Sequence, residues 1–205
     1  MKKKRSGTPR KQWQDHYSRR AQKENYPARS VYKLQEMQQK YAILRKGDRV
    51  LDLGCAPGSW LLFTAKQTGP GGNVIGVDLQ KIDIQLPANA RAIRGDIGEF
   101  DPGWLGEIGR EFDAVISDMA PATTGNKGVD AARSLELCRT ALDIALQVLR
   151  PGGNFVCKIF QGADVKDFER EVSHSFDNIK NFKPRSSRKA SKELFIIGFG
   201  KKTPG

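Results

Sequence analysis

Short apolar runs alternate with helix-like segments through the middle of the chain. Runs of this length and composition are typical of buried strands, and the segments between them have the spacing of amphipathic helices. This alternation predicts an α/β fold in which helices cover both faces of one doubly wound, mostly parallel sheet. The predicted strands are 49–53, 73–79, 91–94, 112–118, 154–159 and 194–199.

The clearest predicted helix spans residues 131–149. Its apolar residues recur at steps of three and four, which places them on one helix face, and Pro151-Gly152-Gly153 then stops the helix. We interpret this face as core packing rather than as a binding surface. Its members are Leu135, Cys138, Leu142, Ala145, Leu146 and Leu149.

Length and composition fit one soluble domain. The chain has 205 residues, of which 38% are hydrophobic and 28% charged. No run approaches the roughly 18 apolar residues of a membrane span, and the polar segment 8–20 stands where a signal peptide would need apolar residues. The three cysteines are scattered without a C-x-x-C pair, which suggests neither disulfides nor a zinc or other metal site. We therefore expect a cytoplasmic protein.

The net charge of +12 is concentrated at the two ends of the chain. Residues 1–29 carry a net charge of +8 and residues 178–205 carry +7, whereas the segment between them carries −3. Clustered Lys and Arg bind polyanions by releasing counterions, so we predict contact with RNA or DNA. A solvated tail remains an alternative for Lys2–Arg5. The aromatic residues Trp13, Tyr17, Tyr26 and Tyr32 favour nucleic acid, because rings among cations can stack on bases.

A glycine loop follows the first predicted strand directly. Strand 49–53 runs into Gly54-Cys55-Ala56-Pro57-Gly58-Ser59-Trp60 and then into an apolar helical segment. Glycines let the backbone approach a ligand, and the N–H groups at the start of a helix favour an anionic group. Asp78 ends the next strand, where a carboxylate can accept hydrogen bonds from ribose hydroxyls. The loop lacks the patterns of NAD and ATP sites.

Segment 51–60 resembles the first motif of the FtsJ/RrmJ family of S-adenosylmethionine-dependent RNA ribose 2′-O-methyltransferases. Segments 29–34, 117–121, 158–162 and 183–193 resemble further motifs of this family, in the same order, and the resemblance covers residues 10–200. It implies a single-domain Rossmann-like methyltransferase fold over residues 30–205, preceded by a basic, RNA-contacting arm at 1–29. It also implies S-adenosyl-L-methionine as the cofactor. Ala122 departs from the Asn that the family commonly carries there.

The resemblance implies a catalytic tetrad of Lys33, Asp118, Lys158 and Glu193. Asp118, Lys158 and Glu193 fall at strand ends, where doubly wound sheets bind ligands. Any one of these residues alone, Glu193 above all, would fit a surface charge or a structural salt bridge.

Methylation of a ribose requires help from the protein, because its 2′-hydroxyl is a poor nucleophile at neutral pH. The site must align the hydroxyl with the methyl group and remove its proton. We interpret Lys158 as the proton acceptor, because burial and a neighbouring cation such as Lys33 favour a neutral amine. The nearby carboxylates favour a charged amine instead. In that case Lys158 would orient the hydroxyl oxygen, and the proton would leave to water.

The resemblance also implies a set of cofactor contacts. Asp96 would lie near the adenine amino group, although it also fits a helix N-cap. Trp60 lies in the family's cofactor loop, although it equally fits the core. Asp118 would lie close to the methionine moiety, so its binding and catalytic roles are hard to separate. The full predicted set is Gly54, Pro57, Gly58, Trp60, Asp78, Asp96 and Asp118.

The resemblance implies methyl transfer to a uridine ribose of large-subunit (23S) rRNA in the assembled 50S particle, and the basic ends of the chain agree with RNA as the substrate. We expect a monomer without an obligate protein partner or a membrane. The alternatives are a tRNA ribose methyltransferase and a noncatalytic ribosome-assembly factor, although a pure binder has no need of the tetrad. Arg19, Arg20, Arg29, Lys33 and the segment 185–192 are expected to face one side and to contact phosphates with little readout of bases.

Overall fold

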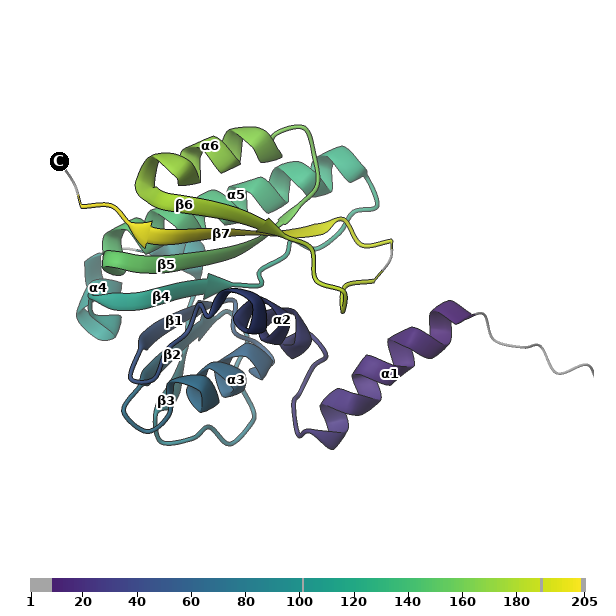
Figure 1. Cartoon of the computed structure of the whole chain (residues 1–205), viewed down its shortest axis with the longest axis horizontal. Coiled ribbons are helices and arrows are strands. Elements are labelled where there is room, and N and C mark those ends of the chain that lie inside the picture. The colour runs from purple at the N-terminus through teal and green to yellow at the C-terminus, as the bar shows by residue number, and fades with distance from the viewer. Residues whose placement is uncertain (1–8, 101, 189, 204–205) are drawn as a thin grey trace, which may run out of the picture.

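A twisted sheet with helices on both faces forms the body of the protein, as the computed structural model shows (Figure 1). The structure describes residues 9–100, 102–188 and 190–203, and for residues 9–15, 102 and 105 it describes the backbone only. The strands are β1 (Arg49–Leu53), β2 (Asn73–Asp78), β3 (Ala90–Arg94), β4 (Phe112–Ser117), β5 (Leu149–Phe160), β6 (Phe176–Phe182) and β7 (Glu193–Lys201). They form one seven-stranded sheet in the order β3-β2-β1-β4-β5-β7-β6.

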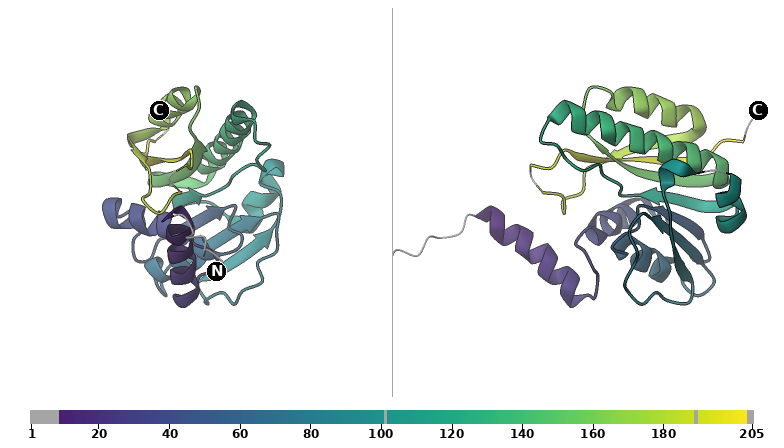
Figure 2. Two further views of the ribbon diagram at one scale, coloured as in Figure 1. Left: turned by 90° about the vertical axis from the view of Figure 1, so that its right-hand side faces the viewer. Right: turned by 180° about the vertical axis from the view of Figure 1, so that it is seen from behind.

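The helices pack in two layers against this sheet (Figures 1 and 2). One layer contains α2 (Val31–Tyr41) and α3 (Ser59–Thr68), and the other contains α4 (Pro102–Ile108), α5 (Lys127–Val148) and α6 (Val165–Ser175). The short 3₁₀ helix η1 spans Ile97–Glu99. Helix α1 (Pro9–Lys23) extends outward beside α2, and its Ala21 is buried in the core under α2 and α3. The predicted fold class, an α/β sheet with helices on both faces, is confirmed.

Strand direction agrees with the prediction of a mostly parallel sheet. Strands β1 to β5 pair in parallel, and β7 pairs antiparallel with both β5 and β6. Strand β6 was not predicted from the sequence, because its apolar residues Phe176, Ile179 and Phe182 are three positions apart and do not alternate with polar residues.

The predicted helix 131–149 differs from α5 at both ends. The helix begins at Lys127, because the Asn126 side chain accepts hydrogen bonds from the N–H groups of Gly128 and Val129 and caps it. It ends at Val148, and Leu149 already belongs to β5. Pro151-Gly152-Gly153 therefore lies inside the first half of this strand and does not terminate the helix.

The topology brings several loops to one edge of the sheet. The chain leaves β1 toward β2 on one side, whereas it leaves the adjacent β4 toward β5 on the other. The loops that follow β1 and β4 thus diverge, which opens a crevice at the carboxyl ends of the strands. Because β7 is antiparallel, its first residue lies at this same edge, and Glu193 pairs with Phe160 at the end of β5.

Three buried cysteines, Cys55, Cys138 and Cys157, are free thiols. Within the described ranges, we find no helix with the length and apolar character needed to cross a membrane.

Candidate active site

Four charged side chains from distant parts of the chain meet at the carboxyl edge of the sheet. Nζ of Lys33 lies 3.3 Å from Oδ1 of Asp118 and 3.1 Å from Oε1 of Glu193. Nζ of Lys158 lies 2.9 Å from the same Asp118 oxygen and also donates a hydrogen bond to the backbone carbonyl of Asp118. Asp118 thus contacts both lysines, and Lys33 contacts both carboxylates. The structure brings together all four residues that the sequence singled out.

The alternation of side chains along the strands explains this convergence. Phe195 packs under α2 and α3, and Glu193, two residues earlier in β7, points to the same face. Lys158 pairs with Phe195 across β5 and β7, and only 6% of its surface is exposed. Lys33 reaches the tetrad from α2, which packs on this face of the sheet because its residues Val31 and Leu34 are buried in the same core cluster as Phe195. The tetrad therefore lies between the sheet and α2.

Charge balance keeps the Glu193 carboxylate ionised. Burial acts to raise the pKa of Glu193, but the positive charges of Lys33 and Lys158 and a hydrogen bond from Lys33 outweigh burial and hold it below its ordinary value. Ser187 Oγ donates a hydrogen bond to the second carboxylate oxygen at 3.3 Å. Such a set of fixed donors and acceptors can hold and orient a hydroxyl group.

A cavity of about 380 Å³ lies next to the tetrad, with Asp118 in its wall. Asp78 is fixed at the end of β2, because its carboxylate accepts hydrogen bonds from the backbone N–H groups of Ala56 and Gln80, both at 2.8 Å. The cavity joins the loops that follow β1, β2, β3 and β4. Its lining is Gly54, Ala56, Asp78, Leu79, Gln80, Asp96, Ile97, Gly98, Asp118, Met119, Ala120, Leu137 and Thr140.

Asp96 and Gly54 each have a structural role in this wall. Oδ1 of Asp96 accepts a hydrogen bond from the N–H of Gly98 at 2.8 Å and caps η1, so the capping interpretation holds while the residue also lines the cavity. Gly54 has a φ of +76°, and a Cβ there would collide with Cγ of Met119. Glycine is therefore required for both conformation and space, since the backbone passes directly beside Met119.

Three predicted cofactor residues are absent from the cavity lining that the described residues form: Pro57, Gly58 and Trp60. Trp60 is a core residue that is 3% exposed, stacks on Phe195 and donates from Nε1 to the carbonyl oxygen of Ser30 at 2.9 Å. Gly58, with a φ of +105°, is packed against Ile84. The core interpretation of Trp60 is the one that the geometry favours, because α3 begins at the loop and turns this ring under α2.

Sequence reasoning missed a buried carboxyl group beneath the tetrad. Asp52 in β1 is 1% exposed, and neither carboxyl oxygen has a hydrogen-bond partner among the described residues. Burial raises the pKa of Asp52 well above its ordinary value, and the neighbouring carboxylates of Asp118 and Asp78 raise it further. The sequence did contain a signal for this buried group, because Asp52 stands within the otherwise apolar run 50–53.

Several of the predicted RNA-contacting residues lie close together. Arg29 donates to the carbonyl oxygen of Ser186 at 2.5 Å, and the N–H groups of Arg185 and Ser186 donate to the carboxylate of Glu36 on α2 at 2.7 and 2.8 Å. Glu36, which sequence reasoning also missed, thus holds the segment after β6 against α2. The run Lys2–Arg5, the side chain of Trp13 and the residue at position 189 lie outside what the structure describes.

Comparison with known proteins gives consistent matches. Residues 26–201 match the FtsJ-like methyltransferase family. A protein of Desulforapulum autotrophicum named ribosomal RNA large subunit methyltransferase E is 59% identical, covering 93% of this chain and 94% of that protein. A protein of Desulfatibacillum aliphaticivorans with the same name is 52% identical, with coverage of 98% and 97%. A crystal structure described as a ribosomal RNA methyltransferase from Plasmodium falciparum superposes with a TM-score of 0.78 at 28% identity, covering 87% of this chain and all of that one.

Proposed function

Because this chain belongs to the FtsJ-like methyltransferase family, we propose that it transfers a methyl group from S-adenosyl-L-methionine to a ribose 2′-hydroxyl of large-subunit rRNA. The observation that carries the proposal is the connected set of Lys33, Asp118, Lys158 and Glu193 beside a cavity that shares Asp118. A site for transfer needs both a place for the donor and groups that prepare the acceptor, and Asp118 links the two.

The cavity suits the cofactor by charge and by size. S-Adenosyl-L-methionine carries a sulfonium and an ammonium group, and the charged side chains that line the cavity within the described residues are all aspartates: Asp78, Asp96 and Asp118. Its volume of about 380 Å³ falls within the usual range for small-molecule sites. When bound, the cofactor would supply an electrophilic methyl group. Asp78 would hold its ribose, Asp96 its adenine and Asp118 its methionine moiety.

The lysines prepare the acceptor. Lys33 and Lys158 both contact Oδ1 of Asp118, so their Nζ atoms are close enough together to approach one ribose hydroxyl next to the cavity. Transfer of the methyl group would break its bond to sulfur, leave a neutral thioether and require the hydroxyl to lose its proton, which Nζ of Lys158 would accept if that amine is neutral. If the amine is charged, Lys158 orients the oxygen and the proton passes to water. Glu193 fixes Lys33 in either case.

The finer assignments follow from the family resemblance. We infer a uridine of 23S rRNA in the assembled 50S particle as the substrate, and a cytoplasmic monomer as the enzyme. Residues 30–205 would form the catalytic domain, with residues 1–29 as an RNA-contacting arm. The burial of Ala21 and the contact of Arg29 with Ser186 support an arm that is attached to the body beside the active site.

The position of the methyl group on its product tests this proposal. Purified protein would be incubated with methyl-labelled cofactor and either undermethylated 50S particles, free 23S rRNA or tRNA, followed by digestion to nucleosides. We expect label in a 2′-O-methylated nucleoside from the large subunit and none with Asp118→Ala. Label confined to bases would contradict the proposal, and so would label confined to tRNA when tRNA and the ribosomal substrates compete. Wild-type protein that binds rRNA but forms no product would indicate an assembly factor.

A further inference from the structure

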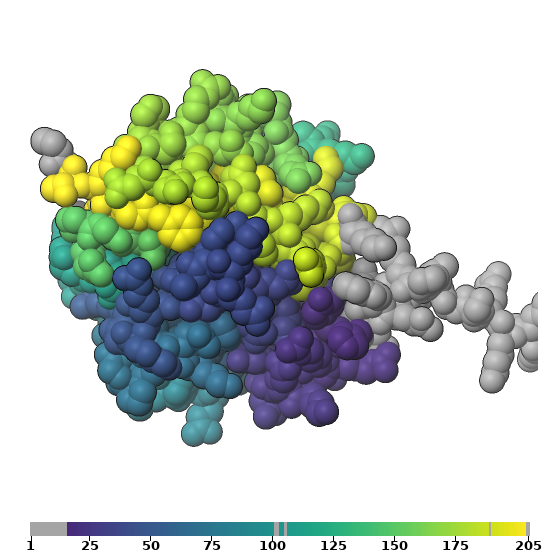
Figure 3. Space-filling view, in the orientation of Figure 1, coloured from purple at the N-terminus to yellow at the C-terminus, as the bar shows by residue number. Residues whose placement is uncertain are grey.

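A groove of about 680 Å³ lies outside the cofactor cavity, between α1, α2 and the segment that follows β6. These three parts of the chain meet on the face shown in Figure 3, where purple, dark blue and yellow-green atoms adjoin. The groove is lined by Tyr17, Arg20, Tyr32, Gln35, Glu36, Gln39, Lys40, Asn181, Phe182, Lys183 and Arg185. None of these residues is needed to explain the cofactor cavity.

The lining combines aromatic rings with cations. Tyr17 and Phe182 are half-buried, so each ring keeps a part of its surface accessible from the groove. The guanidinium of Arg20 lies 4.6 Å from the ring centroid of Tyr32, and Nζ of Lys40 lies 5.4 Å from that of Phe182. Rings bordered by cations are the usual means by which proteins hold single-stranded nucleic acid, because bases stack on the rings while phosphates meet the charges.

The groove is cationic overall. Arg20, Lys40, Lys183 and Arg185 are exposed around it, and Glu36 is the single carboxylate among the described residues of this lining, while Arg20 is paired with Glu24 at 2.7 Å just outside it. Both carboxylate oxygens of Glu36 accept hydrogen bonds from backbone N–H groups, and the four cations outnumber this one negative charge. The amide groups of Gln35, Gln39 and Asn181 add donors and acceptors that can reach the edges of a base.

Both walls of the groove lead to the tetrad. On α2, Lys33, Glu36 and Lys40 are spaced i, i+3 and i+7 and share one helix face, so the groove extends only about 10 Å from the tetrad along this helix. On the other wall, the chain runs from Lys183 to Glu193, where β7 begins. A strand of RNA whose ribose meets Lys33 would therefore continue directly into the groove.

We propose that this groove binds an unpaired nucleotide adjacent to the methylated ribose, with its base stacked on Tyr17 or Phe182 and its phosphate held by the surrounding cations. The inference rests on the proposed function, because it takes RNA as the substrate. It differs from the expectation drawn from charge alone, which was phosphate contact with little contact to bases. Ring stacking requires an unstacked base, so the groove selects single-stranded over double-stranded RNA.

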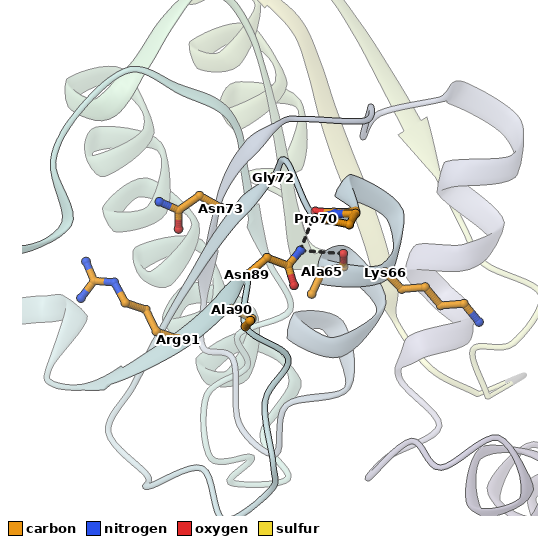
Figure 4. A pocket seen from close by; sticks show the side chains of 10 residues that line it. Ala65, Lys66, Pro70, Gly72, Asn73, Asn89, Ala90 and Arg91 are labelled. Carbon is orange, nitrogen blue, oxygen red and sulfur yellow. Dashed lines mark hydrogen bonds between the residues drawn. The ribbon is translucent and has the colours of Figure 1, made fainter.

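A second pocket, of about 720 Å³, lies at the opposite edge of the sheet (Figure 4). Its central side chain, Asn89, donates hydrogen bonds to the carbonyl oxygens of Ala65 and Gly69 at 2.9 and 2.8 Å and so completes the end of α3. Asn89 thus has a structural role, and the exposed Lys66 that lines this pocket offers a matched control for a change of charge in the groove.

Equilibrium binding of two probes tests the groove. A short single-stranded oligouridylate and an RNA duplex of equal length would be titrated against the full chain and its variants. If the base stacks on Tyr17, Tyr17→Ala should weaken binding of the single strand by between about 5-fold and 150-fold, the range for loss of one base stack, and should leave duplex binding unchanged. If the base stacks on Phe182 instead, Phe182→Ala should have this effect. Tyr17→Phe, which keeps the ring, should bind as wild type does.

The charge variants complete the test. Lys40→Gln should reduce the slope of log affinity against log salt by about one, whereas Lys66→Gln should leave it unchanged. Equal weakening on both probes, or no weakening with folded Tyr17→Ala and Phe182→Ala, would overturn the groove proposal. Methyl transfer by the wild type, measured in parallel, separates the two proposals. If the ring variants bind as wild type does but the wild type methylates ribose normally, the groove proposal is overturned and the proposed function stands. If binding depends on the rings but the wild type does not methylate ribose, the proposed function alone is overturned.

Discussion

Replacement of Lys158 by methionine should stop methyl transfer without unfolding the protein. Breaking a buried ion pair by removing one partner typically costs about 3–5 kcal/mol of stability. In the variant, Asp118 would still have Lys33 as an ion-pair partner at 3.3 Å, and the Asp118 side chain is 15% exposed. Methionine would also retain the buried apolar stem of Lys158. We therefore expect a loss of about 1–3 kcal/mol, which a typical domain with a free energy of unfolding of about 5–15 kcal/mol withstands.

The rate should fall much further than the stability. Removal of a positioned proton acceptor typically lowers a rate by about 10²- to 10⁴-fold. Lys158 is not part of the cavity lining, so the Kd for the cofactor should remain close to that of wild type. Single-turnover methyl transfer, calorimetric titration with the cofactor and urea unfolding measure the three quantities. A rate within about tenfold of wild type would refute the catalytic role, and a large loss of cofactor affinity would assign Lys158 to binding instead.

Lys158→Arg distinguishes the two possible roles of this lysine. A guanidinium stays protonated at any working pH, so arginine can orient an oxygen but cannot accept its proton. If Lys158 takes the proton, Lys158→Arg should be as inactive as Lys158→Met. Partial activity of the arginine variant, with methionine inactive, would show that orientation by a positive charge is the larger contribution.

Three further replacements test other parts of the site. Because burial raises the pKa of Asp52, this residue destabilises the folded protein increasingly as pH rises above the ordinary carboxyl pKa. Asp52→Asn should therefore raise the urea midpoint at about pH 8 and have little effect at about pH 4, and a pH-independent effect would contradict this. The pKa of Glu193 is lowered, so its contribution is present above the ordinary carboxyl pKa and is lost as pH falls through the lowered value. Glu193→Gln should lose about 1 kcal/mol near neutral pH and converge with wild type in acid, as urea unfolding at several pH values would show. Gly54→Ala, which places a Cβ against Met119, should weaken cofactor binding in a calorimetric titration, and an unchanged Kd would argue against this wall as the cofactor site.

Parts of the fold in which side-chain pattern and burial agree could be predicted from the sequence. The strand 49–53 is a buried apolar run, and the structure has β1 at the same residues. Strand β6 could not be found in this way, because its apolar residues are three positions apart and give no strand-like alternation. The start of α5 depends on the side chain of Asn126, which an apolar pattern does not register.

Part of the candidate site could likewise be predicted from the sequence, and part of it could not. Motif resemblance singled out Lys33, Asp118, Lys158 and Glu193, and the topology brings them together. Trp60 shows the limit of motif reasoning, because its neighbours in sequence suggest a cofactor loop while the direction of α3 turns the ring into the core. The groove beside α2 was not predictable, because its walls are far apart in the chain and Glu36 joins them only in the folded protein.

A map of 2′-O-methylated riboses in large-subunit rRNA, from cells with and without the gene, tests directly whether this protein methylates that RNA. We expect one ribose to lose its methyl group in the absence of the gene, and we expect the wild-type gene to restore it while a Lys158→Met copy does not. An unchanged ribose map, or a change confined to base methylation, would contradict the claim.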